Sequence, residues 1–165
     1  MPGSVARAIC AAWVLTIAVA APATASSPDA IFVTKTAEAG AQGVELAKLA
    51  AAKASSTAVK AFAQRMAIDR RALTADLLSL AKSKDVRIPP AAAAPGAAEL
   101  ATRKGAAFDQ AFLAQVLKGH DALISLLESE SRDGRDVDLK EWAAKQLPAL
   151  RDQLAKARVL AGRYS

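Results

Sequence analysis

The chain contains one cysteine, Cys10, one histidine, His120, and few aromatic residues, which make up 4% of the sequence. It also contains no Gly-rich phosphate loop and no nucleophile elbow. A single imidazole cannot serve at once as a metal ligand and as a general base. These absences exclude the common nucleotide-binding, thiol and serine-hydrolase sites, and we expect no enzyme activity.

The rest of the composition is rich in alanine and other small hydrophobic residues. Hydrophobic residues make up 53% of the chain, and with so few aromatics this predicts helices packed closely through small side chains, without strands. The formal net charge is +6, but lysine and arginine alternate with aspartate and glutamate along the chain. Such alternation is typical of solvated helix faces, so we expect no nucleic-acid partner.

The first 25 residues have the organisation of a secretory signal peptide. A short basic lead precedes an apolar run of about twelve residues, and Ala23–Ala25 forms a small-x-small cleavage site. A membrane span would need about 20 apolar residues. Cys10 lies before the centre of the apolar run, which argues against a lipoprotein. We therefore expect cleavage after residue 25 and export of residues 26–165 to the periplasm, the extracellular space or the outer membrane.

Apolar residues recur every three or four positions in four later stretches, which is the pattern of amphipathic helices. Between the second and third stretches, Ile88–Gly96 is too rich in proline to be helical, and only Ala97–Arg103 can form a short helical turn. About eighteen linker residues reach about 60 Å, more than the roughly 42 Å length of the second helix. The expected helices cover residues 30–53, 57–85, 106–132 and 136–162.

The length of the linker decides between two topologies. An up-down-up-down bundle needs only a short loop between its second and third helices, whereas a linker that crosses the bundle leaves these helices parallel. We expect the second arrangement, in which two antiparallel helical hairpins are joined by a long Pro/Ala-rich crossover. This arrangement resembles the ferritin-like four-helix bundle, so the expected fold class is all-α.

Three polar residues fall where the apolar stripes predict core. His120 lies inside the stripe of the third helix, Gln42 lies near the centre of the buried side of the first, and Arg70 interrupts the stripe of the second. Gln42 and Arg70 stand at similar distances from the turn between their helices, and so at one height. We expect a polar core layer of Gln42, Arg70 and His120, bordered by Glu38 and Glu45, with a glutamate in contact with Arg70.

Two features of the third and fourth helices complete this expectation. Pro148 lies about as far after the turn between these helices as His120 lies before it, so the kink at Pro148 should face His120. Gly134 is placed to end the third helix with a left-handed cap.

Several residues spread along the chain have an order and spacing that carry a family resemblance. They are Phe32, Glu38, Glu45-Leu46, Val59-Lys60, Phe62, Met66, Asp69, His120 and Leu147-Pro148. In this order they resemble a family of bacterial secreted proteins, domain of unknown function 4142, over residues 30–160. The resemblance implies a signal peptide and a ferritin-like four-helix bundle, without a defined activity. Members commonly carry histidine at the positions of Arg70 and of Asp152 or Gln153, so this chain departs from the family there.

The ligand pattern of a dinuclear metal site is missing. Such a site takes a Glu from each of two helices and a Glu-x-x-His pair from each of the other two. No Glu-x-x-His occurs in the sequence, and we expect no cofactor. A mononuclear site of His120 with Glu38 or Glu45 is the alternative. The structural interpretation is a core histidine hydrogen-bonded to a carboxylate or to the carbonyl freed by Pro148.

These observations indicate an exported, non-catalytic envelope or periplasmic protein with a structural or stress-related role. The first alternative is a divalent-metal-binding bundle that uses His120. The second is an interaction module that associates peripherally with anionic envelope surfaces. The basic residues considered for that surface are Lys48, Lys53, Lys60 and Arg71.

Overall fold

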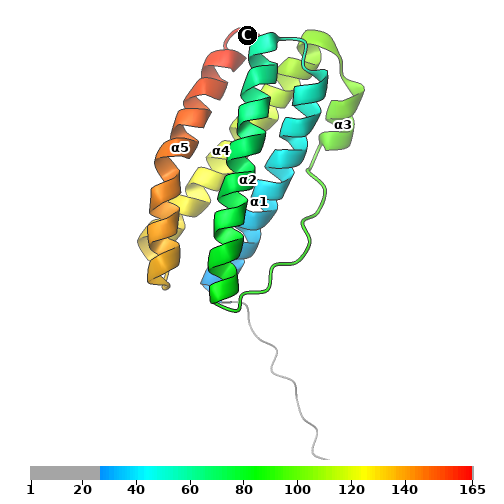
Figure 1. Ribbon diagram of the computed structural model, residues 1–165. Coiled ribbons are helices and arrows are strands. Elements are labelled where there is room, and N and C mark those ends of the chain that lie inside the picture. The colour runs from blue at the N-terminus through cyan, green and yellow to red at the C-terminus, as the bar shows by residue number, and fades with distance from the viewer. Residues whose placement is uncertain (1–26, 165) are drawn as a thin grey trace, which may run out of the picture.

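The computed structural model describes residues 27–164, and the expected signal peptide with Cys10 lies outside this range (Figure 1). The described part is built from five helices and contains no strand, so the all-α fold class is confirmed. None of these helices combines the length and the apolar composition needed to cross a bilayer. The helices are α1 (Pro28–Lys53), α2 (Thr57–Ser83), α3 (Ala97–Thr102), α4 (Gly105–Asp133) and α5 (Val137–Ala161).

Four long helices form the bundle, and they pair as two antiparallel hairpins. α1 packs chiefly on α2, and α4 packs chiefly on α5. The linker leaves the end of α2 and runs along the outside of the bundle to the short helix α3, which lies beside the opposite end (Figure 1). α4 therefore starts near the end of the bundle where α2 starts. The expected crossover is confirmed, and α2 and α4 are parallel.

Side-chain caps mark the start of three of the long helices, α1, α2 and α5. Ser27 accepts a hydrogen bond from the backbone N–H of Ala30, and Ser56 accepts one from Val59. Asp136 caps α5 in the same way. Serine and aspartate satisfy backbone N–H groups that have no partner within the helix. Each long helix begins and ends within about two residues of the range expected from the apolar pattern.

Gly134 follows α4 but does not adopt the left-handed conformation that we expected. Its φ is −58° and its ψ is 150°, which any residue can adopt. A Cβ at this position would lie 2.6 Å from the backbone oxygen of Glu130. Glycine is required here because the chain leaves the helix close to its last turn. The predicted left-handed cap was wrong, because the φ of Gly134 is negative.

Glycines of α1 allow α2 to approach closely. A Cβ at Gly40 would overlap the hydroxyl of Thr74, and a Cβ at Gly43 would lie 3.4 Å from the Nε of Arg70. Both glycines are buried. The close approach therefore requires glycine at Gly40, whereas at Gly43 the stem of Arg70 lies at ordinary contact distance.

The hydrophobic core is divided into two clusters along the bundle. In α2 the division falls between Met66 and Leu73, and in α4 it falls between Val116 and Leu123. One cluster fills the end near the turn between α4 and α5, and the other fills the end near the turn between α1 and α2. The height between the clusters is occupied by buried polar residues.

Candidate functional site

Arg70 of α2 and His120 of α4 meet at the centre of the bundle. The Nη2 of Arg70 lies 2.9 Å from the Nε2 of His120. The two residues are 3% and 1% exposed. Two members of the expected polar layer are therefore in direct contact between the two core clusters.

The hydrogen bonds of His120 identify its protonation state. Its Nδ1 lies 2.9 Å from the carbonyl oxygen of Val116, which can only accept, so Nδ1 carries a proton. Nε2 then accepts from Arg70, which can only donate. Burial and the neighbouring guanidinium lower the pKa of His120 from 6.5 to about 4. His120 is therefore a neutral imidazole at physiological pH, with both nitrogens engaged.

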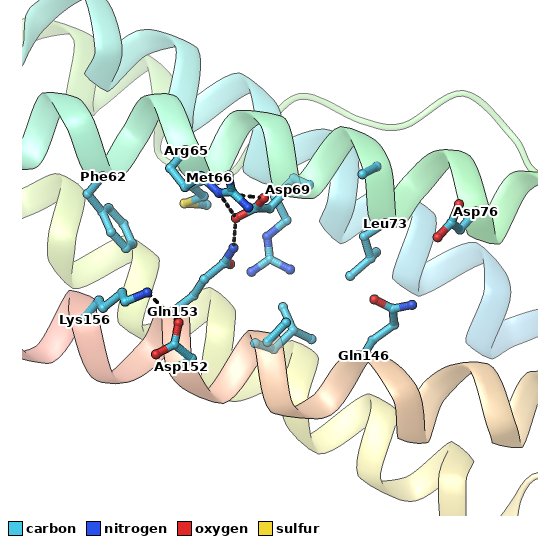
Figure 2. A pocket seen from close by; sticks show the side chains of 14 residues that line it. Phe62, Arg65, Met66, Asp69, Leu73, Asp76, Gln146, Asp152, Gln153 and Lys156 are labelled. Atoms are coloured by element: carbon cyan, nitrogen blue, oxygen red, sulfur yellow. Dashed lines mark hydrogen bonds and ion pairs between the residues drawn. The ribbon is translucent and has the colours of Figure 1, made fainter.

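Asp69 and Gln153 extend the layer toward solvent. The amide nitrogen of Gln153 donates to Asp69 Oδ2 at 2.6 Å, and its Oε1 lies 3.2 Å from Nε2 of His120. Nε2 has no proton in this tautomer, so the second contact joins two acceptors and is not a hydrogen bond. Asp69 also pairs with Arg65 at 2.9 Å. Figure 2 shows Asp69 between Arg65 and Gln153, which come from α2 and α5.

Sequence reasoning missed Asp69 and Gln153 as members of this layer. Asp69 forms the charged interruption in the stripe of α2 together with Arg70, but only Arg70 was expected in the core layer. Gln153 precedes Leu154, a buried residue of the α5 stripe. The apolar period alone does not predict that Gln153 turns inward.

The other three candidate residues do not join His120. Gln42 is half-buried and donates to Glu38 at 3.2 Å. Glu45 accepts a hydrogen bond from the backbone N–H of Ala94 at 2.8 Å, and this bond ties the linker to α1. Neither glutamate forms an ion pair with Arg70 within the part of the chain that the structure describes, so the predicted contact across the hairpin was wrong.

The positions of Glu38 and Glu45 also bear on the alternative of a mononuclear metal site. Over residues 27–164, no three His, Cys, Asp or Glu side chains are grouped closely enough to hold a metal ion. His120, Glu38 and Glu45 are thus not brought together as a ligand set. The Nε2 lone pair, which a metal ion would need, faces the guanidinium of Arg70.

Pro148 does not face His120, contrary to expectation. It lies within α5 with an exposed side chain, whereas Leu147 and Leu150 of the same turn are buried. The histidine bonds instead to Val116 of its own helix. The carbonyl freed by the proline is not its partner.

Arg70 lies at the walls of two cavities. The first, of about 500 Å³, is between α2 and α5, and its lining residues carry charges of both signs, including Asp76, Asp152 and Lys156 (Figure 2). The second, of about 540 Å³, is between α1 and α4 under the linker residue Gly96. Burial lowers the pKa of Arg70 to about 10, so the guanidinium stays charged at neutral pH.

The description "Domain of unknown function (DUF4142)" belongs to the family model that matches residues 15–160. The chain belongs to this family. The predicted resemblance to the DUF4142 family is therefore confirmed.

Among solved structures, this DUF4142 chain is similar to a DUF305 fragment from Deinococcus radiodurans, with a TM-score of 0.74 and 14% sequence identity. The match covers 83% of this chain and 97% of that one. At this identity the similarity establishes the helical fold and nothing about activity. No curated protein matches the sequence.

A second buried cluster of this DUF4142 chain surrounds Asp109 at the start of α4. Its carboxylate accepts hydrogen bonds from the backbone N–H groups of Ser55 and Ser56 at 3.0 and 2.8 Å. It also accepts from the hydroxyls of Ser55 at 2.7 Å and Tyr164 at 3.0 Å. Burial alone would raise the pKa of Asp109, but these hydrogen bonds lower it below its usual value.

Asp109 therefore joins the α1–α2 turn, α4 and the residues after α5. Sequence reasoning missed it, although an aspartate next to Phe108 in the apolar stripe was a usable signal. The cluster is a structural joint, because the carboxylate accepts four hydrogen bonds from groups of the same chain, one on Oδ1 and three on Oδ2.

Lys53, one of the basic residues considered for binding an anionic surface, makes contacts within the bundle. The ammonium of Lys53 donates to the carbonyl oxygen of Ala101 and lies 5.9 Å from the ring centroid of Phe108. Lys53 therefore holds α3 and the start of α4 against the end of α1. Lys48 and Arg71 are exposed on α1 and α2.

Proposed function

We propose that this DUF4142 protein is an exported, non-catalytic helical-bundle protein of the cell envelope with a structural or stress-related role. The observation that supports a non-catalytic role is the state of His120. Its two nitrogens are engaged with Val116 and Arg70, and its pKa of about 4 leaves it a weak base. A general base needs a free lone pair and a pKa near the working pH.

The proposal is tested on protein purified without chelators from its own host. Elemental analysis should find no stoichiometric metal. The melting temperature should stay the same with EDTA and with added Mn²⁺, Fe²⁺ or Zn²⁺, because a ligand that binds only the folded state raises this temperature. A chelator-sensitive melting temperature in the wild type that disappears in His120→Gln would instead support the metal-binding alternative.

The exported location is tested separately. Mass spectrometry of the protein from fractionated host cells should find a mature chain that begins at Ser26, as the cleavage site predicts. A chain that retains Cys10, in the cytoplasm or as a lipid-modified form, would contradict the proposed processing. Neither result depends on the metal measurement.

A further inference from the structure

The cavity between α1 and α4 differs in the charge of its lining residues from the cavity between α2 and α5. Among residues 27–164, the charged residues that line the α1–α4 cavity are Arg70 and Lys118, and no acidic residue of this range lines it. The remaining wall is mainly apolar and includes Leu46, Met66 and Leu123. Its volume of about 540 Å³ lies within the usual range of small-molecule sites.

Arg70 lines both cavities and has hydrogen-bond donors that the protein does not use. Its Nε and Nη1 are buried and have no partner among the described protein atoms, and only Nη2 is bonded, to His120. Of the two free donors, Nε lies near Gly43, which lines the cavity between α1 and α4. Because His120 is neutral, the buried pair carries one positive charge. A buried guanidinium without a carboxylate partner is costly, and an anionic ligand would offset that cost.

Two other lining residues bear on the site. The amide nitrogen of Gln115 donates to the carbonyl oxygen of Gly96 at 3.4 Å and so ties the linker to α4 beside the cavity. Gly119 lies inside α4, where glycine is less favourable for the helix than alanine. A Cβ there would meet nothing within 4 Å, so packing does not require the glycine, and a methyl group fits at this point of the cavity wall whereas a large side chain would occupy the space.

We propose that this cavity binds a small monocarboxylic acid with an apolar tail. The carboxylate accepts hydrogen bonds from Arg70, since a planar guanidinium matches a carboxylate and one negative charge balances one buried cation. The tail packs against the apolar wall between α1 and α4. The linker residues Pro95 and Gly96 cover the site, and the bond from the Ala94 N–H to Glu45 holds them there. This inference goes beyond the proposed function and does not depend on where the protein resides.

Titration calorimetry and thermal melts with octanoate test the site, with octanol and acetate as probes for the tail and the charge alone. Octanoate should bind and raise the melting temperature. Octanol should bind at least tenfold more weakly, and acetate should have no measurable effect. Equal binding of octanol and octanoate, or no binding of octanoate, would overturn the proposal.

Variants of Arg70 test the role of the charge, and variants of Gly119 test the role of the cavity volume. Arg70→Met keeps the length of the side chain and should abolish octanoate binding, whereas Arg70→Lys should retain part of it. Gly119→Leu should block the cavity and weaken binding at least tenfold, while Gly119→Ala, the matched control, should bind as the wild type does. If Arg70→Met does not fold, the Gly119 pair still decides the question. Undiminished octanoate binding in Gly119→Leu would contradict the assigned cavity.

Discussion

Arg70 of α2 donates from Nη2 to Nε2 of His120 on α4, across 2.9 Å and between the two halves of the hydrophobic core. The bond joins two parallel helices from different hairpins. One of these groups is a cation and the other is an imidazole kept neutral by burial. His120 is therefore a structural hydrogen-bond acceptor for Arg70, and substitution of His120 should lower the stability of the fold.

Substitution of His120 should destabilise the fold by an amount that depends on the replacement. His120→Ala leaves a cavity and removes the acceptor of Arg70, so it should cost about 2–4 kcal/mol in the free energy of unfolding. His120→Gln can place an amide oxygen near the position of Nε2 and should recover part of this loss. Urea unfolding followed by circular dichroism measures both values.

The double variant Arg70→Met/His120→Leu is the control for this explanation. It removes donor and acceptor together, and replacing a buried polar pair by apolar groups of similar volume is often neutral or stabilising. The double variant should therefore be more stable than His120→Ala. A double variant no more stable than His120→Ala would show that the stranded guanidinium does not account for the loss.

The depressed pKa of His120 predicts a loss of stability in mild acid. As the pH falls through about 6.5 the unfolded chain protonates this imidazole, whereas the folded chain does so only near pH 4. The unfolded state thus binds more protons in this window, and the free energy of unfolding should fall by about 3 kcal/mol between pH 6.5 and 4. Carboxylates titrate at the lower edge of the same window, so the test compares wild type with His120→Gln. Parallel stability curves for the two proteins would rule out this role of His120.

Asp109→Asn should weaken the joint between the α1–α2 turn and α4. The amide has one acceptor oxygen in place of two, and its NH₂ group would face donors such as the Ser56 N–H. A loss of about 1–3 kcal/mol is expected, because buried donors are left without acceptors. Asp121→Asn is the matched control, since Asp121 forms an exposed ion pair with Arg158 and should change stability by less than about 0.5 kcal/mol. Equal effects of the two changes would contradict the assignment.

Glycine should be required at Gly134 and dispensable at Gly119. A Cβ at Gly134 would lie 2.6 Å from the backbone oxygen of Glu130, so Gly134→Ala must displace the main chain and should cost about 1–3 kcal/mol. Gly119→Ala meets nothing within 4 Å and should stabilise the helix by about 0.5–1 kcal/mol. Thermal melts of the two variants should shift in opposite directions. A stabilising Gly134→Ala would be inconsistent with the conformation described for this turn.

The sequence determined the local features of this protein. The apolar period placed four long helices within about two residues of their bounds, because helix formation and burial of one face depend on residues close in the chain. The Pro-rich linker determined the crossover by its length alone. The burial of His120 and Arg70 also followed from their positions within apolar stripes.

Only the tertiary structure decided which polar groups meet. Helical period gives the face of a residue to within tens of degrees, whereas a hydrogen bond requires atoms from different helices to lie within about 3.5 Å. For this reason Glu38 or Glu45 was expected at Arg70, but Glu38 bonds to Gln42 and Glu45 to the linker at Ala94. Gln153 was not expected in the layer but lies beside His120. The packing of the helices places the Nε of Arg70 near Gly43 of α1. It leaves Nε and Nη1 without a partner among residues 27–164, which no pattern along the chain predicts.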